Sequence, residues 1–144
     1  MDKYHELWRF GNKSFRRTAK KLRHITVQLD ILTMIAEAEE KRNAGIAAAM
    51  SHADSAAPYN WSDKAYSYVK NYLQNKKVGH RFQVEDIRML AEQERKVMPP
   101  PSQRAWGGII VRIRNEKIIK ADGTAPVINP KAHRANATVW VKIA

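Results

Sequence analysis

The side chains best suited to chemistry lie together between Ser102 and Asn115. This stretch contains arginine, glutamine, serine and asparagine, whose polar groups can bind phosphate oxygens and the edges of bases. The planar fork of arginine can hold guanine O6 and N7 together, so it can combine affinity with base choice. These residue types therefore point toward contacts with a nucleic acid.

The spacing of this stretch predicts a helix with two different sides. Four apolar residues recur at i, i+3, i+4 and i+7 and are expected to be buried: Trp106, Ile109, Ile110 and Ile113. Five residues are expected to face outward: Arg104, Gly108, Val111, Arg112 and Asn115. Ser102 follows three prolines and is expected to cap the helix. Gly107 and Gly108 each lower the stability of the helix by up to about 1 kcal/mol relative to alanine. We therefore expect another backbone or a ligand to approach them closely.

Two strands are expected after this helix, at 118–120 and 137–143. Turn residues at 122–126 and 129–130 separate them, and the loop carries basic side chains. His133 either donates to a phosphate or ties the loop to a backbone carbonyl. Trp140 is either part of the core or a platform for stacking. Helix, strand, basic loop and strand are the second half of a winged helix-turn-helix.

The elements before this helix complete one predicted domain at 62–144. Ser62 is expected to cap a helix through about Asn75, an extended segment follows at 81–83, and a second helix runs from Val84 to Glu94. The expected core packs Trp106, Ile110 and Ile113 against Val69, Leu73, Ile87 and Leu90. The predicted fold class is α+β, mostly α: a winged helix-turn-helix domain preceded by a helical N-terminal extension.

Residues 1–25 form an expected basic N-terminal arm. Trp8, Phe10 and Phe15 alternate with basic residues, and no acid occurs between Asn12 and Arg23. The arm either becomes ordered on a phosphate backbone, or is a solvated, partly helical tail, or lies upstream of the start that the cell mainly uses. Its expected DNA contacts are Lys13, Arg16, Arg17, Lys20, Lys21 and Arg23.

Residues 26–60 form an expected helical extension and linker. Helix formers dominate this segment, but Gly45 lies inside it, which leaves either one long helix or two helices that meet near Gly45. The stretch 55–60 reads as a linker to the compact domain.

The net charge of +12 favours a polyanionic partner. Residues 1–30 contain eight basic and three acidic side chains, and residues 99–144 contain eight and two, so positive charge gathers at both ends. Nucleic acid is the commonest cytoplasmic polyanion. The alternatives are a basic protein with no such partner and a protein that binds acidic lipid.

Several classes of protein are disfavoured by the sequence. No apolar run is long enough to cross a membrane and the start lacks a secretory layout, so we predict a cytoplasmic protein without membrane contact, at the nucleoid when bound to DNA. The absence of cysteine excludes thiol chemistry. The five histidines lack the i, i+4 spacing of a helical metal pair, and no phosphate loop or nucleophile elbow occurs. We therefore predict no metal, no cofactor and no enzymatic activity.

Several short motifs resemble a group of small winged-helix proteins encoded by bacteriophages and prophages. The most specific are Arg104-Ala105-Trp106-Gly107 and the segment from His133 to Trp140; the others are at 61–65, 85–88, 100–103 and 129–133, with Phe82 and the stretch 43–47. The resemblance covers about residues 40–144. It implies DNA binding or an assembly role among phage replication and recombination genes. One departure is Gln83, which replaces a threonine cap and implies a cap weaker by about 1 kcal/mol.

The sequence therefore predicts a non-enzymatic double-stranded DNA-binding protein, acting in phage replication, recombination or transcription control. The helix would enter the major groove and the loop would lie on the backbone. The expected DNA contacts are Ser102, Gln103, Arg104, Gly108, Val111, Arg112, Asn115, Lys120, Lys131, His133 and Arg134. Arg114 is expected at the core edge, away from DNA.

The main alternative is a winged-helix adaptor that binds other proteins in a phage replication or assembly complex, since the helix at 26–54 could pair with a partner or with itself. Homodimerisation and contact with phage or host replication proteins are both compatible with the sequence. A nuclease subunit would need a carboxylate cluster, which the sequence lacks.

Overall fold

The computed structural model describes residues 3–128 and 135–144. Within the first helix it describes the side chains of Thr18, of residues 20–23, of Ile25 and of residues 27–56. The chain forms two compact units, Met1–Arg42 and Asn43–Ala144. This division differs from the expected boundaries at residues 25 and 60.

A single helix, α1 (Lys3–Ala56), contributes to both units. It continues through Gly45 without a break, so the expectation of one long helix is confirmed and that of two helices is wrong. The expected boundary between arm and extension falls inside α1. Its last turns, from Asn43 onward, belong to the second unit, where Ala49 and Ala53 are buried in the core.

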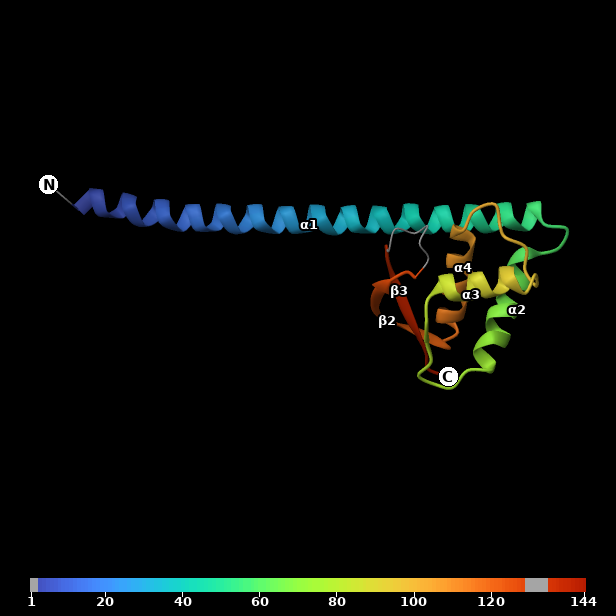
Figure 1. Cartoon of the computed structure of the whole chain (residues 1–144). Helices are drawn as coiled ribbons and strands as arrows, with labels where there is room; N and C mark the ends of the chain where they lie inside the picture. Colours follow the sequence, from blue (N-terminus) through green and yellow to red (C-terminus); the bar gives the residue numbers. More distant parts are fainter. Residues whose placement is uncertain (1–2, 129–134) are drawn as a thin grey trace. The chain divides into compact units, whose positions relative to one another are not determined.

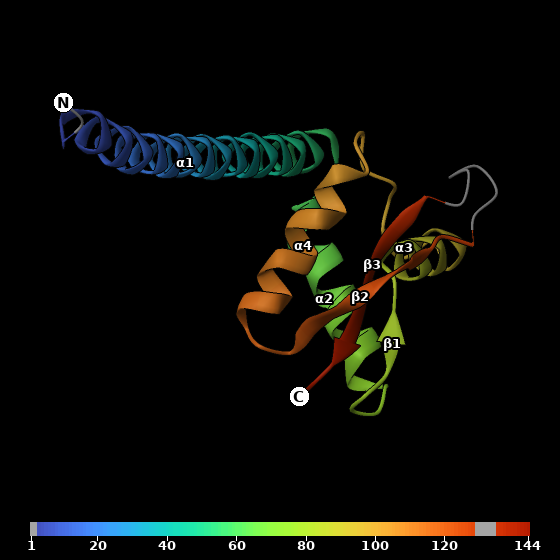
Figure 2. The ribbon, with the colours of Figure 1, turned by 90° about the vertical axis from the view of Figure 1, so that its left-hand side faces the viewer.

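The described residues of the second unit include three shorter helices and three strands. They are α2 (Trp61–Gln74), β1 (Arg81–Phe82), α3 (Val84–Gln93), α4 (Arg104–Asn115), β2 (Ile119–Pro126) and β3 (Asn136–Lys142). The sheet is antiparallel with the order β1-β3-β2. α2 and α4 pack together, and the β2–β3 hairpin follows α4 (Figures 1 and 2). The α+β class, mostly helical, is confirmed.

The core joins all three helices of this unit to the sheet. Trp106 packs edge-on against Trp61, with ring centroids 5.3 Å apart, and the Trp61 indole donates to the Met98 carbonyl at 2.8 Å. All four residues of the predicted stripe on α4 are buried, together with Val69, Leu73 and Ile87 from α2 and α3. Leu90 is an exception, because it is partly exposed and lines a pocket. Trp140 is partly buried and packs against the core.

Two of the expected helix caps are displaced. Asn60, not Ser62, caps α2 by accepting from the Asp63 N–H at 3.2 Å. Ser62 is buried instead, where its backbone N–H and hydroxyl donate to the Asp54 carboxylate. These two bonds tie the start of α2 to α1.

The second displaced cap is at α4, which begins at Arg104 with Gln103 in the cap position. Ser102 Oγ still accepts from the Arg104 N–H, at 3.4 Å. The first backbone bonds, Ala105 N to Ser102 O and Trp106 N to Gln103 O, span three residues. The start is therefore a tight 3₁₀ turn, and the cap position lies one residue later than expected.

The loop expected at 122–126 is part of β2. A register shift between Ala121 and Thr124 accommodates Asp122 and Gly123, and Gly123 has a φ of 87°. The turn residues therefore produce a β-bulge in place of a loop. Pro126 ends β2, which lies at the sheet edge, where a missing N–H is tolerated.

Candidate functional site

The α4 helix has three environments around its axis: a buried stripe, a side that faces α2, and an open side. The open side carries Arg104, Val111, Arg114 and Asn115, of which Val111 is half-buried and the other three are exposed. Arg114, which was expected at the core edge, is exposed. Arg112 is also exposed, on the side of α4 that faces α2.

Gly108 was expected to face outward, and this is wrong. It is buried, and a Cβ placed on it would lie 1.8 Å from Met50 Sδ and 3.2 Å from Ile46 Cγ2. The last turns of α1 therefore lie directly on Gly108. The expected close approach is present, but it comes from the chain's own α1 helix, so Gly108 is unable to contact DNA.

The side of α4 that faces α2 carries a polar network. Arg112 Nη1 lies 3.1 Å from Asp63 Oδ1, and its guanidinium stacks 3.9 Å from the centre of the Tyr66 ring. Tyr66 Oη donates to Glu116, at 2.6 Å from Oε1, and Lys70 Nζ lies 3.4 Å from Glu116 Oε2. Arg112, an expected DNA contact, is thus engaged by α2.

This network shifts the ionisation of two of its members. The hydrogen bond from Tyr66, with the charges of Lys70 and Arg112, holds the pKa of Glu116 below its ordinary value. The hydrogen bonds of Lys70 to Tyr66 and then to Glu116 raise the pKa of that ammonium. Both effects favour the charged forms, so the network stabilises the packing of α4 on α2 electrostatically. It also turns the carboxylate of Glu116 toward α2.

A basic cluster lies where α4 ends and β2 begins. We define it as Arg114, Lys117 and Lys120, which are all exposed. Lys117 has a φ of 59° and its N–H donates to the Arg114 carbonyl at 2.9 Å, which places the two residues in one tight turn. None of the three forms an ion pair with an acid among the described residues.

The remaining expected contacts are divided between exposed and undescribed positions. Ser102 is half-buried, Gln103 is exposed, and Arg104 Nη1 would lie 3.6 Å from a Cβ at Gly45 of α1. Lys131, His133 and Arg134 lie outside the described residues. In α1, Lys20, Lys21 and Arg23 are exposed, whereas Lys13, Arg16 and Arg17 lie among the side chains outside the description.

Sequence reasoning missed Lys117 and Arg114. Their spacing of three places both at the same end of the helix, and Lys120 follows at the same interval. That signal was available in the sequence. The pairing of Arg112 with Asp63, 49 residues earlier, gave no local signal.

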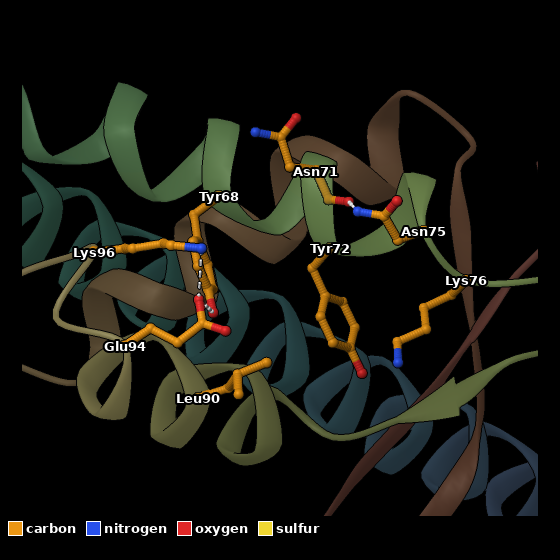
Figure 3. A pocket seen from close by; sticks show the side chains of 8 residues that line it. All are labelled: Tyr68, Asn71, Tyr72, Asn75, Lys76, Leu90, Glu94 and Lys96. Atoms are coloured by element: carbon orange, nitrogen blue, oxygen red, sulfur yellow. Dashed lines mark hydrogen bonds and ion pairs between the residues drawn. The ribbon is translucent and has the colours of Figure 1, made fainter.

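The structure also contains a pocket of about 270 Å³ between α2 and α3 (Figure 3). Tyr68, Glu94 and Lys96 lie together at one end, and Tyr72 and Lys76 at the other. Tyr68 Oη donates to Glu94 Oε2 at 3.1 Å, and Lys96 Nζ lies 3.0 Å from the same oxygen.

Burial and hydrogen bonding shift the ionisation of side chains in this pocket. Burial, followed by the hydrogen bond to Glu94, raises the pKa of Tyr68 to about 12. The phenol therefore remains protonated near neutral pH and acts as a hydrogen-bond donor, not as a base. Lys96 and Tyr68 lower the pKa of Glu94, so that side chain remains a paired carboxylate.

The described residues contain no group of three or more histidine, cysteine or acidic side chains that could hold a metal ion. In that part of the chain, no helix is long and apolar enough to cross a membrane. Comparisons with protein-family models, with curated proteins and with solved structures found no match.

Proposed function

We propose that this protein is a non-enzymatic double-stranded DNA-binding protein of the phage type, with a winged helix-turn-helix domain. The order helix, strand, helix, helix, strand, strand and the sheet order β1-β3-β2 support that topology. In this proposal α4 is the groove-facing helix and the connection between β2 and β3 is the wing. The chemistry needs no cofactor.

The observation that carries the proposal is the arrangement of charge around α4. The one acid in the turn that ends the helix, Glu116, is held toward α2 by Tyr66 and Lys70, whereas Arg114 and Lys117 are exposed. The open side therefore presents cations to solvent without a neighbouring carboxylate to neutralise them. Such a surface attracts phosphates, and Asn115 adds an amide that can bind a base edge.

A titration of a labelled random duplex at several salt concentrations tests the proposal. The double variant Arg114→Ala/Lys117→Ala is expected to weaken binding about 10-fold or more and to lower the slope of log K against log salt by about 0.9 for each lost phosphate contact. The control is Arg112→Ala/Lys96→Ala, which removes the same charge from two side chains that have acidic partners.

The control should bind within a few-fold of the unsubstituted protein. Equal losses in both variants would mean that only net charge matters. If neither variant weakened binding while both stayed folded, the assignment of binding to the end of α4 would be overturned. If the unsubstituted protein did not bind duplex at any salt concentration, the DNA-binding proposal itself would be overturned.

A second candidate function is the adaptor that binds proteins. It is favoured by a run of exposed apolar side chains on α1, from Leu22 to Ile35. A DNA-binding surface does not require such a run. If the duplex titration fails, capture of a partner by this segment becomes the better proposal.

A further inference from the structure

The segment 20–40 of α1 exposes an unusual amount of apolar surface. Eight large apolar side chains in it have exposed fractions between 44% and 68%: Leu22, Ile25, Val27, Leu29, Ile31, Leu32, Met34 and Ile35. At about 1.5 Å per residue the segment is roughly 30 Å long. Contiguous apolar surface of this kind marks an interaction site.

The apolar residues form two stripes on opposite sides of the helix. Leu22, Ile25, Leu29, Leu32 and Ala36 are separated by three, four, three and four positions, which is the heptad spacing of paired helices. A second stripe contains Val27, Ile31, Met34 and Ala38, spaced by four, three and four. A helix that is apolar on two sides is normally covered by other helices.

The charges at the two ends of this segment have opposite signs. Lys20, Lys21 and Arg23 are exposed at its N-terminal end, and Glu37, Glu39 and Glu40 are exposed at its C-terminal end. Between Arg23 and Glu37 the sequence contains a single Asp or Glu, Asp30, and no Lys or Arg. The segment is thus basic, then apolar, then acidic.

In two antiparallel copies of this segment, the basic end of each copy lies beside the acidic end of the other. When two copies are aligned antiparallel, Lys20 lies level with Glu40 of the second copy, Lys21 with its Glu39, and Arg23 with its Glu37. Within one residue, the same alignment sets Leu29 against Leu32 of the second copy. Ile25 then lies near Ala36 of that copy. Along the helix axis, the charge pairs and the heptad stripe therefore agree on one register to within one residue. Around the axis, Lys21 and Glu40 border the first stripe, Glu39 continues it, and Lys20 and Arg23 lie on the side of the second stripe.

A parallel alignment has the opposite electrostatic outcome. It places Lys20 and Lys21 beside the same lysines of the second copy, and Glu39 and Glu40 beside the same glutamates. Like charges at the flanks of paired helices disfavour the pairing, whereas opposite charges select partner and orientation.

We propose that residues 20–40 of α1 are an antiparallel self-association segment, whose partner is a second copy of this chain. The second stripe allows two such pairs to associate further, so the expected assemblies contain an even number of chains. This inference is independent of DNA binding. It places Lys20, Lys21 and Arg23 level with the acidic end of a second copy, and leaves the basic residues at 13–17 for another partner.

The mass of the full-length protein, measured by sedimentation equilibrium over a range of concentrations without DNA, tests the proposal. A dimer or tetramer is expected. The variant Leu29→Lys/Leu32→Lys should be monomeric over the same range. The control Met89→Lys, at an apolar side chain on α3 that is 51% exposed, should keep the assembly. Circular dichroism and tryptophan fluorescence check that each variant is folded.

Orientation is tested by reversing charge at each end. Lys20→Glu/Lys21→Glu/Arg23→Glu, and separately Glu37→Lys/Glu39→Lys/Glu40→Lys, should each weaken association by at least about tenfold. The chain with all six changes should recover, because opposite charges again lie level with each other in an antiparallel pair. A parallel pair would give no such recovery.

A monomer at every concentration, a trimer, or a six-fold variant as weak as the two parents would overturn the proposal. Since the measurement contains no DNA, its failure would leave the DNA-binding proposal standing. Conversely, if the protein assembled but failed to bind duplex, only the DNA-binding proposal would be overturned.

Discussion

At the residue scale, adjacent glycines on α4 have different structural roles. A Cβ on Gly107 would make ordinary contact, 3.6 Å from Ile46 Cδ1, whereas a Cβ on Gly108 would overlap Met50. Identical substitutions at the two positions therefore separate helix propensity from packing. Gly107→Ala should stabilise the protein by about 0.5–1 kcal/mol, because alanine favours the helix and fits.

Gly108→Ala gains the same propensity but displaces both Met50 Sδ and Cγ in a buried site. It should be less stable than Gly107→Ala by roughly 1–3 kcal/mol, the usual range for overpacking. Urea denaturation of both variants measures the difference. Equal stabilities would show that α1 does not rest on Gly108.

The contrast between Arg112 and Arg114 shows what local sequence leaves undetermined. The apolar spacing located the buried stripe of α4 correctly, including Trp106, which is 1% exposed. It did not decide which of the remaining sides faces α2. That depends on where Asp63 and Tyr66 lie after folding, and both come from an element 40 residues away or more. Which of the remaining sides of α4 packs on α2 can therefore be learned only from the tertiary structure.

At the element scale, the contact of α4 with α2 should respond to acid. The folded-state pKa of Glu116 lies below its ordinary value because Tyr66 and Lys70 favour the carboxylate. The folded state therefore binds that proton less readily than the unfolded state does. The Glu116 carboxylate therefore stabilises the fold at neutral pH. This stabilisation is lost as the pH falls below the ordinary pKa near 4.5 and then through the lowered pKa of the folded state.

The variant Glu116→Gln tests this effect by urea denaturation at neutral pH and near pH 3. The variant should be less stable than the unsubstituted protein at neutral pH, and the difference should shrink in acid. Glu92→Gln, an exposed carboxyl on α3, serves as the control. A difference for Glu116→Gln that did not change with pH would contradict the electrostatic role of the network.

Elements were easier to predict from the sequence than their ends. Capped apolar periodicity located α2, α3 and α4, since each buries one stripe. The length of β2 was underestimated, because Asp122 and Gly123 are typical of turns and here form a bulge. The role of the last turns of α1 was missed as well. Ile46 and Met50 lie against Gly107 and Gly108, about 60 positions later, and no local sequence pattern predicts such a contact.

At the scale of the whole molecule, the basic side chains of α1 divide between two tasks in our proposals. Lys20, Lys21 and Arg23 lie level with the acidic end of a second copy, which leaves Lys13, Arg16 and Arg17 for phosphates. The variant Lys13→Gln/Arg16→Gln/Arg17→Gln keeps the self-association segment intact. It should therefore assemble like the unsubstituted protein.

The same variant should bind all duplexes more weakly and without a change in sequence preference, because phosphate contacts position a protein but do not select bases. The slope of log K against log salt should fall by about 0.9 for each phosphate contact that is lost.

Deletion of residues 1–24 should weaken duplex binding further, since it also removes three cations from the association segment and so weakens assembly. The titration and the sedimentation measurement are made on the same samples. If the triple glutamine variant bound random duplex as tightly as the intact chain, the first turns of α1 would have no part in DNA binding, and the affinity would have to come from the second unit alone.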